Sequence, residues 1–245
     1  MTSAEIAALL SAAFGGPEQP LAAWYANLLD ATPPLRAFTA AHATKLRKKL
    51  RHAGSLEALR DLRCELAVAA ALADRRSPLS YEPLAAAGTR GPDFLLRHKG
   101  HTDVYIEVSR LRPARSEERD PTDRLASALC GKLGQLIAGA ANLLVLVSDD
   151  GPFSAEQLGA TVQGLRRRAD AKDDAFFAFR GLAGARALPQ LLSRLSGVLL
   201  VAPAVPAEAL FLHQQARQPL PADLARAASS WGLAASIGPL AGVVS

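Results

Sequence analysis

Two acidic residues, Asp93 and Glu107, stand on neighbouring segments that the sequence predicts to be strands. Residues 91–96 and 104–111 alternate apolar and polar side chains with a period of two, and the polar stretch 97–101 between them contains a glycine, as a hairpin connection would. Pairing of the two arms brings the carboxylates together, where they repel each other unless they share a proton or a cation. A hard cation such as Mg2+, which prefers oxygen ligands, would relieve this repulsion.

The same residues resemble a nuclease signature. The triplets Pro-Asp-Phe at 92–94 and Glu-Val-Ser at 107–109 are similar to the motif of the PD-(D/E)XK, or restriction-endonuclease-like, nuclease superfamily. In that superfamily the Asp and the Glu hold a metal ion, and the last residue of the second triplet is a lysine that activates or orients the attacking water. Asp93 and Glu107 match this pattern. Ser109 departs from it, because it stands where the lysine is expected.

The resemblance implies further site residues on two helices. Glu65 lies beside the apolar stripe of a helix expected over residues 55–75, where the superfamily often carries a glutamate near the metal. Lys132, on a helix expected over about 122–140, is the candidate that replaces the missing lysine, because the catalytic cation of this superfamily can lie on a neighbouring helix. Gln135, one turn later on the same face, is similar to a helix glutamine also seen near the site in this superfamily. The implied catalytic set is Asp93, Glu107, Lys132, Gln135 and Glu65, and the implied ligands of Mg2+ or Mn2+ are Asp93, Glu107, Glu65 and the carbonyl oxygen of Val108.

Each candidate also has a purely structural interpretation. Glu107 could form a salt bridge with Arg97 or Arg110, and Asp93 could serve only as a turn former after a proline. Glu65 could lie on a helix surface and pair with an arginine of its own helix, and the candidates on the later helix could be ordinary surface residues. These alternatives stay open at the level of sequence.

The densest basic run covers residues 45–51. On a helix, this spacing places Leu46 and Leu50 on one face and the cations on the others. Such a run is usually a solvated face. It could instead be a helix edge that contacts phosphates and adds salt-dependent affinity for nucleic acid.

The composition sets only broad limits on function. The chain has 245 residues, 49% of them hydrophobic and 21% charged, which is ordinary for a globular protein with a substantial core. Its formal net charge of +5 is compatible with a polyanionic partner. The two cysteines, Cys64 and Cys130, lack metal-ligand spacing, which favours a reduced cytoplasmic compartment without structural zinc.

Several protein classes lack their sequence signals. No apolar stretch is long enough to cross a bilayer, and the first residues lack the basic region of a signal peptide, so we expect no membrane partner. There is no GxxxxGK(S/T), GxGxxG, HExxH or GxSxG motif, which argues against P-loop, Rossmann, zincin and α/β-hydrolase chemistry.

The order of elements predicts an α/β fold with a mixed sheet flanked by helices, the order expected of a restriction-endonuclease-like core. A strand, a helix and a further buried strand in succession imply a parallel pair. Besides the hairpin, strands are expected at 80–84, 143–147, 198–201 and 210–212. We expect residues 1–40 to form an N-terminal helical arm, residues 41–215 the core, and residues 216–245 a C-terminal helix and tail packed on it.

Two functions from different classes follow from these expectations. The first is a nuclease that hydrolyses phosphodiester bonds of DNA or RNA with Mg2+ or Mn2+, with DNA as the favoured partner and a homodimer as the arrangement that supplies one site for each strand. The second is a catalytically inactive nuclease fold that binds nucleic acid or acts as a scaffold, since the motif lysine is missing.

Overall fold

A computed structural model describes residues 3–73, 77–85, 91–113, 120–205 and 207–238 of the chain. The expected tail beyond residue 238 and the expected helix end at residues 74–75 lie outside these ranges. No helix in the described ranges is long and apolar enough to cross a membrane. Cys64 and Cys130 are both buried and unbridged.

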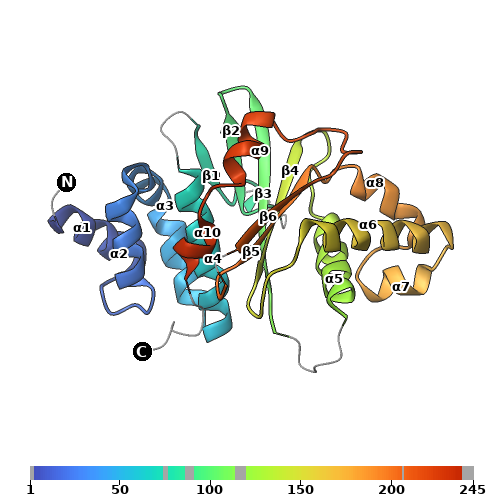
Figure 1. The fold of residues 1–245 in the computed structure, drawn as a ribbon. Coiled ribbons are helices and arrows are strands. Elements are labelled where there is room, and N and C mark those ends of the chain that lie inside the picture. Colours follow the sequence, from blue (N-terminus) through green and yellow to red (C-terminus); the bar gives the residue numbers. More distant parts are fainter. Residues whose placement is uncertain (1–2, 74–76, 86–90, 114–119, 206, 239–245) are drawn as a thin grey trace.

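The centre of the fold is one six-stranded mixed sheet, in which the spatial order of the strands follows their order in the chain (Figure 1). The first three strands form an antiparallel meander, the third to fifth run parallel, and the sixth is an antiparallel edge strand. The α/β class, the hairpin and the parallel pair predicted from the sequence are therefore confirmed. The strands are β1 Leu79–Tyr81, β2 Phe94–His98, β3 Thr102–Leu111, β4 Ala141–Ser148, β5 Gly197–Ala202 and β6 Ala207–Leu212.

Helices cover both faces of the sheet (Figure 1). The first four helices and the last two pack on one face, and those between pack on the other, each over its own apolar cluster. The helices are α1 Ser3–Phe14, α2 Ala22–Ala31, α3 Pro33–His52, α4 Leu56–Leu72, α5 Pro121–Leu133, α6 Ala155–Asp170, α7 Asp174–Phe179, α8 Leu188–Leu192, α9 Ala222–Ala228 and α10 Leu233–Ile237, with a 3-10 turn η2 at Ala185–Ala187.

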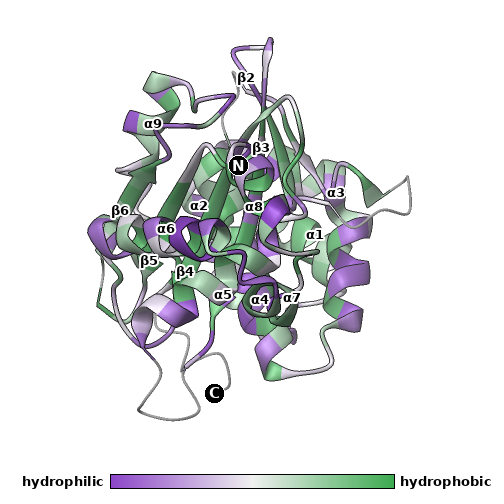
Figure 2. Cartoon of the chain, turned by 90° about the vertical axis from the view of Figure 1, so that its right-hand side faces the viewer, coloured by the Kyte–Doolittle hydropathy of each residue, from purple (hydrophilic) through white to green (hydrophobic). Residues whose placement is uncertain are grey.

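The two central parallel strands, β4 and β5, are buried along their whole length, which explains their continuous apolar sequences. Figure 2 shows these hydrophobic strands in the interior, whereas helices such as α3 and α6 carry hydrophilic stretches. On α3 the leucines Leu46 and Leu50 are buried, as the basic run predicted. The N-terminal helices join the same apolar cluster as α4, and α3 runs without a break through residues 40 and 41.

Two elements end earlier than the sequence predicted. β1 stops at Tyr81 because Glu82 adopts a left-handed backbone conformation (φ 46°) that turns the chain away from the sheet. The helix expected over 122–140 ends at Leu133, and the chain continues in turns towards β4. In these turns Gly139 has a φ of 78°, a conformation that favours glycine.

A buried asparagine at the start of β4 fixes the connection between α5 and β4. The side chain of Asn142 accepts a hydrogen bond from the backbone N–H of Ile137 at 2.9 Å and donates to the carbonyl oxygens of Ile137 and Ala140, each at 2.9 Å. It also donates to the carbonyl of Arg194 at 3.0 Å. Backbone groups that no secondary structure satisfies are therefore paired by one side chain, which holds the connection between α5 and β4 in place.

We expect Asn142→Ala to lower the free energy of unfolding by about 3 kcal/mol, because several buried backbone groups lose their partner at once. The measurement is urea unfolding followed by circular dichroism. The matched control is Asn27→Ala at an exposed position of α2, which should change stability by less than about 0.5 kcal/mol. Equal effects of the two substitutions would contradict this role of Asn142.

Candidate functional site

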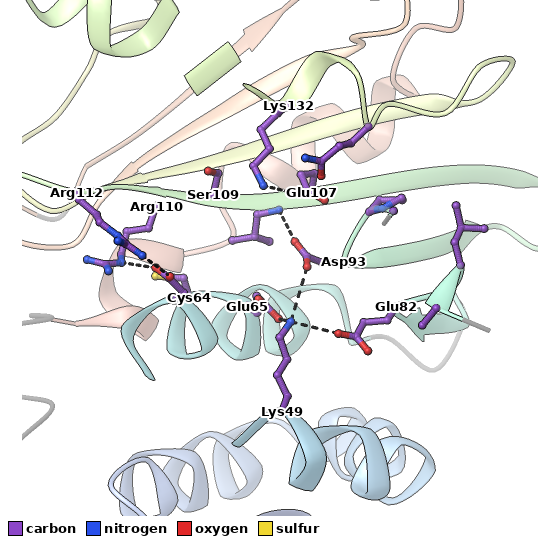
Figure 3. A pocket seen from close by; sticks show the side chains of 17 residues that line it. Lys49, Cys64, Glu65, Glu82, Asp93, Glu107, Ser109, Arg110, Arg112 and Lys132 are labelled. Atoms are coloured by element: carbon purple, nitrogen blue, oxygen red, sulfur yellow. Dashed lines mark hydrogen bonds and ion pairs between the residues drawn. The ribbon is translucent and has the colours of Figure 1, made fainter. Parts of the chain in front are cut away.

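A cavity of about 570 Å3 opens at the end of the β2–β3 hairpin, where α3, α4 and α5 converge (Figure 3). Its wall includes Lys49 from α3, Glu65 from α4, Asp93 just before β2, Glu107 from β3 and Lys132 from α5. Four of these five residues were site candidates in the sequence. The fold thus gathers acidic and basic side chains from five separate segments around one cavity.

Asp93 is tied to the strand that carries Glu107. β2 pairs with β3 up to Phe94 opposite Ile106, so Asp93 lies level with Glu107 one step beyond the last pair. The Oδ2 of Asp93 accepts a hydrogen bond from the backbone N–H of Val108 at 2.8 Å. Because N–H and C=O of one strand residue point to the same side, the Val108 carbonyl also points towards Asp93. Asp93 is therefore more than a turn former.

Glu107 pairs with a lysine from the following helix. Its Oε1 lies 2.6 Å from the Nζ of Lys132, and the Glu107 side chain is only 6% exposed. The alternative pairing with an arginine is wrong, because Arg97 pairs with Asp103 and Arg110 points to the other face of β3, where three carboxylates hold it. The expected lysine replacement thus lies in direct contact with the motif glutamate.

Glu65 lies inside the cavity and not on a helix surface. Its Oε2 accepts hydrogen bonds from the Nζ of Lys49 at 2.6 Å and from the hydroxyl of Tyr81 at 2.7 Å. The expected alternative pairing with an arginine of α4 is wrong: Arg60 pairs with Glu57. Glu65 therefore faces the same space as the two hairpin acids.

Lys49 lies among three carboxylates (Figure 3). Besides Glu65, its Nζ lies 3.4 Å from Oε1 of Glu82 and 4.0 Å from Oδ1 of Asp93. It also lies 5.2 Å from the centre of the Tyr81 ring, within cation–π range. One ammonium group therefore neutralises acids from α4, from the turn after β1 and from the start of β2.

Burial and mutual repulsion change the protonation of the acids. Burial and then repulsion from Glu107 raise the pKa of Asp93 to about 7. Burial and then repulsion from Asp93 raise the pKa of Glu65 to about 7. Burial alone would lower the pKa of Lys49, but the attraction of Glu65, Asp93 and Glu82 outweighs it and raises that pKa. The acids thus remain costly to ionise even beside a charged lysine.

The candidate Gln135 and the residue at the motif lysine's position, Ser109, line the cavity wall without joining this ionic cluster. Gln135 follows the end of α5, and its amide donates to the carbonyl of Gly131 at 3.4 Å. Ser109 lies on the same face of β3 as Glu107. Neither is part of the ion pairs that connect Asp93, Glu107, Glu65 and the two lysines.

The donor set fits a hard divalent cation, although the present arrangement does not form a finished metal site. Within the described ranges, no group of three or more His, Cys, Asp or Glu side chains is arranged to hold a metal ion. The acids are instead engaged by Lys49 and Lys132. Carboxylate and carbonyl oxygens are nevertheless the ligands that Mg2+ and Mn2+ prefer, and four carboxyl groups share this end of the cavity with two ammonium groups.

Sequence reasoning missed Lys49, Tyr81 and Glu82. Lys49 was included only as one cation of a basic run. A signal was present, because Lys49 stands three residues after the buried Leu46 and therefore borders the buried face of α3. Nothing comparable marks Tyr81 or Glu82, whose positions depend on the turn that ends β1.

Comparison of the chain with protein-family models, with curated proteins and with solved structures found no match. Any function proposed for the chain therefore depends on the geometry and chemistry of the cavity.

Because the folded state holds protons on Asp93 and Glu65 more tightly than the unfolded state does, stability should fall as the pH rises from about 4 to about 7 and level off above. Asp93→Asn keeps an oxygen for the Val108 N–H, and we expect it to weaken this decrease. The free energy of unfolding of the variant minus that of the wild type should rise by about 2 kcal/mol between pH 4 and pH 8. The measurement is urea unfolding across this pH range in EDTA.

The control for this prediction is Asp30→Asn, at an acid whose side chain is 79% exposed, which should follow the wild-type profile. If Asp93→Asn also follows the wild-type profile, Asp93 is not held at a raised pKa.

Proposed function

We propose that this protein is a metal-dependent nuclease that hydrolyses phosphodiester bonds of DNA or RNA with Mg2+ or Mn2+. The observation that carries the proposal is the adjacency of Asp93 and Glu107 at the end of the hairpin, with the ammonium of Lys132 2.6 Å from Glu107. This arrangement supplies both acids of the motif and a cation where Ser109 leaves none. Two carboxylates and a lysine are the groups that such a hydrolysis needs.

The fold agrees with the restriction-endonuclease-like core that the motif implies. An antiparallel hairpin carries the two acids, a helix follows, and the next strand lies parallel to the second arm of the hairpin. Glu65 reaches the same cavity from the helix that precedes the sheet. We therefore assign the chain to this fold as part of the proposal.

In the proposed site Asp93, Glu107, Glu65 and the Val108 carbonyl would hold the ion. A bound ion there would supply Lewis-acid polarisation of the scissile phosphate and a water of lowered pKa. Lys132 orients the attacking water or stabilises negative charge on the phosphate, and Glu107 holds that ammonium in place. Gln135 lies at the cavity wall, where its amide can contact the substrate.

A second candidate is a nuclease fold that binds nucleic acid or acts as a scaffold without cleaving. The observation that favours it is that lysines already neutralise the acids, while Ser109 replaces the motif lysine. The exposed cations Arg47, Lys48 and Arg51 on α3 would then contact phosphates. This function predicts binding to DNA or RNA that weakens steeply with salt, with no turnover.

We expect wild-type protein to bind Mn2+ in calorimetry and Glu107→Ala to lose this binding, because a carboxylate of the ion's ligand set is removed. Asp93→Ala and Glu107→Ala should each lower metal-dependent cleavage by about 10³-fold or more. DNA is the first substrate to test and RNA the second, with the oligomeric state measured in parallel because two strands need two sites.

The matched control is Glu18→Ala, at an exposed glutamate far from the cavity in sequence, which should bind Mn2+ like the wild type. Cleavage that persists in Glu107→Ala would contradict the assignment of Glu107 to the catalytic site. Salt-dependent binding of an oligonucleotide without Mn2+ binding or cleavage would establish the second candidate instead.

Lys132→Ala should lower cleavage by about 10²-fold to 10⁴-fold, the usual contribution of a positioned proton-transfer or charge-stabilising group, while Mn2+ binding is retained. The paired measurements are cleavage rate and calorimetry on the same preparation. Unchanged cleavage would mean that Lys132 is only the counterion of Glu107 and that another cation replaces the motif lysine.

A further inference from the structure

Lys49 occupies the space in which a cation shared by Glu65 and Asp93 would lie. Its Nζ is 2.6 Å from Glu65, 3.4 Å from Glu82 and 4.0 Å from Asp93. Figure 3 shows its side chain rising from α3 into the gap between these carboxylates. The side chain is still 30% exposed, so part of it already reaches solvent.

The fold holds α3 in the position that delivers this lysine. One turn before Lys49, the Nζ of Lys45 donates to the carbonyl oxygens of Tyr81 at 2.6 Å and of Glu82 at 3.2 Å. On the adjoining face Leu46 and Leu50 are buried in the apolar cluster. Because the helix backbone is anchored at these points, Lys49 enters the cavity as a consequence of the fold and not as a chance surface contact.

We propose that Lys49 is an internal counterion that closes the acidic site in the metal-free protein and is displaced when a divalent cation binds. This inference rests on the proposed metal-dependent function. An ammonium group and a metal ion cannot both occupy the space between Glu65 and Asp93, and like charges repel there. The four-carbon stem of lysine lets the ammonium swing out without movement of the helix.

This role explains why the described residues contain acids of the right type for a metal but no finished metal-binding group. With Lys49 withdrawn, Glu65 and Asp93 would each lose a cationic partner that currently offsets their repulsion. A divalent ion supplies twice the charge at the same place. Lys49 thus offsets the repulsion between the buried acids until the ion binds.

Lys132 is not the group that is displaced. It pairs with Glu107 from α5, on the other side of the sheet from α3. Lys49 instead contacts the two acids, Glu65 and Asp93, that the ion would have to bridge. Displacement of Lys49 leaves Lys132 beside Glu107, where the proposed reaction needs it.

The test is Mn2+ calorimetry on wild type, Lys49→Met and Lys48→Met. We expect Lys49→Met to bind Mn2+ about tenfold more tightly than wild type, because one charge-assisted hydrogen bond no longer has to be broken. Lys48→Met removes an exposed charge from the same helix next to Lys49 without touching these carboxylate oxygens, and it should change the affinity by less than about twofold.

The outcomes separate this inference from the proposed function. Wild-type binding with equal or weaker binding by Lys49→Met would overturn the counterion role while leaving the metal site intact. Tighter binding by both lysine variants would reveal a general charge effect and would also overturn it. Absence of Mn2+ binding in the wild type and in every variant would remove the proposed metal-dependent function and this inference together.

A second measurement uses the native chain and so does not depend on the folding of a variant. Brief labelling with acetic anhydride and peptide mass spectrometry report how accessible each lysine is. At Mg2+ concentrations that saturate the site, label at Lys49 should rise severalfold, while label at the exposed Lys48 serves as the internal reference. Unchanged label at Lys49 in metal-saturated protein would overturn the inference.

Discussion

The constraint on which the cavity depends is the burial of carboxyl groups beside one another. The side chains of Glu65, Asp93 and Glu107 are 12%, 17% and 6% exposed, and charges buried so close together are costly unless they are paired. Two helices on opposite faces of the sheet each supply one lysine, and Tyr81 adds a hydroxyl donor. The placement of α3 and α5 around the hairpin is therefore inseparable from the neutralisation of these acids.

A second ionic cluster at the same cavity pairs its acids with an arginine instead of a lysine. Arg110, whose side chain is 1% exposed, donates to Glu57, Asp61 and Asp149 and so links α4 to β3 and to the end of β4. Burial would lower the pKa of Arg110, but these hydrogen bonds outweigh it and raise that pKa. A guanidinium with fixed donors holds its partners permanently, whereas a lysine is a mobile point charge. The arginine cluster is therefore suited to a fixed structural link, and the lysine cluster to the proposed exchange of an ammonium group for a metal ion.

The sequence was sufficient for features that depend on local periodicity. The hairpin, the buried strands β4 and β5, and the capping serines of α4 and α6 were all predictable from alternation and cap residues. The acidic pair could be predicted to meet because two paired strands carry it, whereas Lys132 was expected near it only through the resemblance to a nuclease motif. Lys49 could not be predicted to join them, since its place among the acids depends on how α3 packs against the end of β1. The turns after α5 were missed for a similar reason, because Asn142, a side chain from β4, pairs their backbone groups.

This last contact connects the fold to the chemistry of the proposed site. A lysine at position 109 would share the face of β3 with Glu107, and its backbone would be held by the pairing of the strand. Lys132 instead lies in the last turn of α5, where a helix frays unless its end is held. The hydrogen bonds of Asn142 to Ile137 and Ala140 hold the chain just after that turn against the sheet. In the proposed site the cation lies on a helix and not on the strand, and a buried anchor at the α5–β4 junction, which the motif residues alone do not reveal, holds the chain that follows this helix.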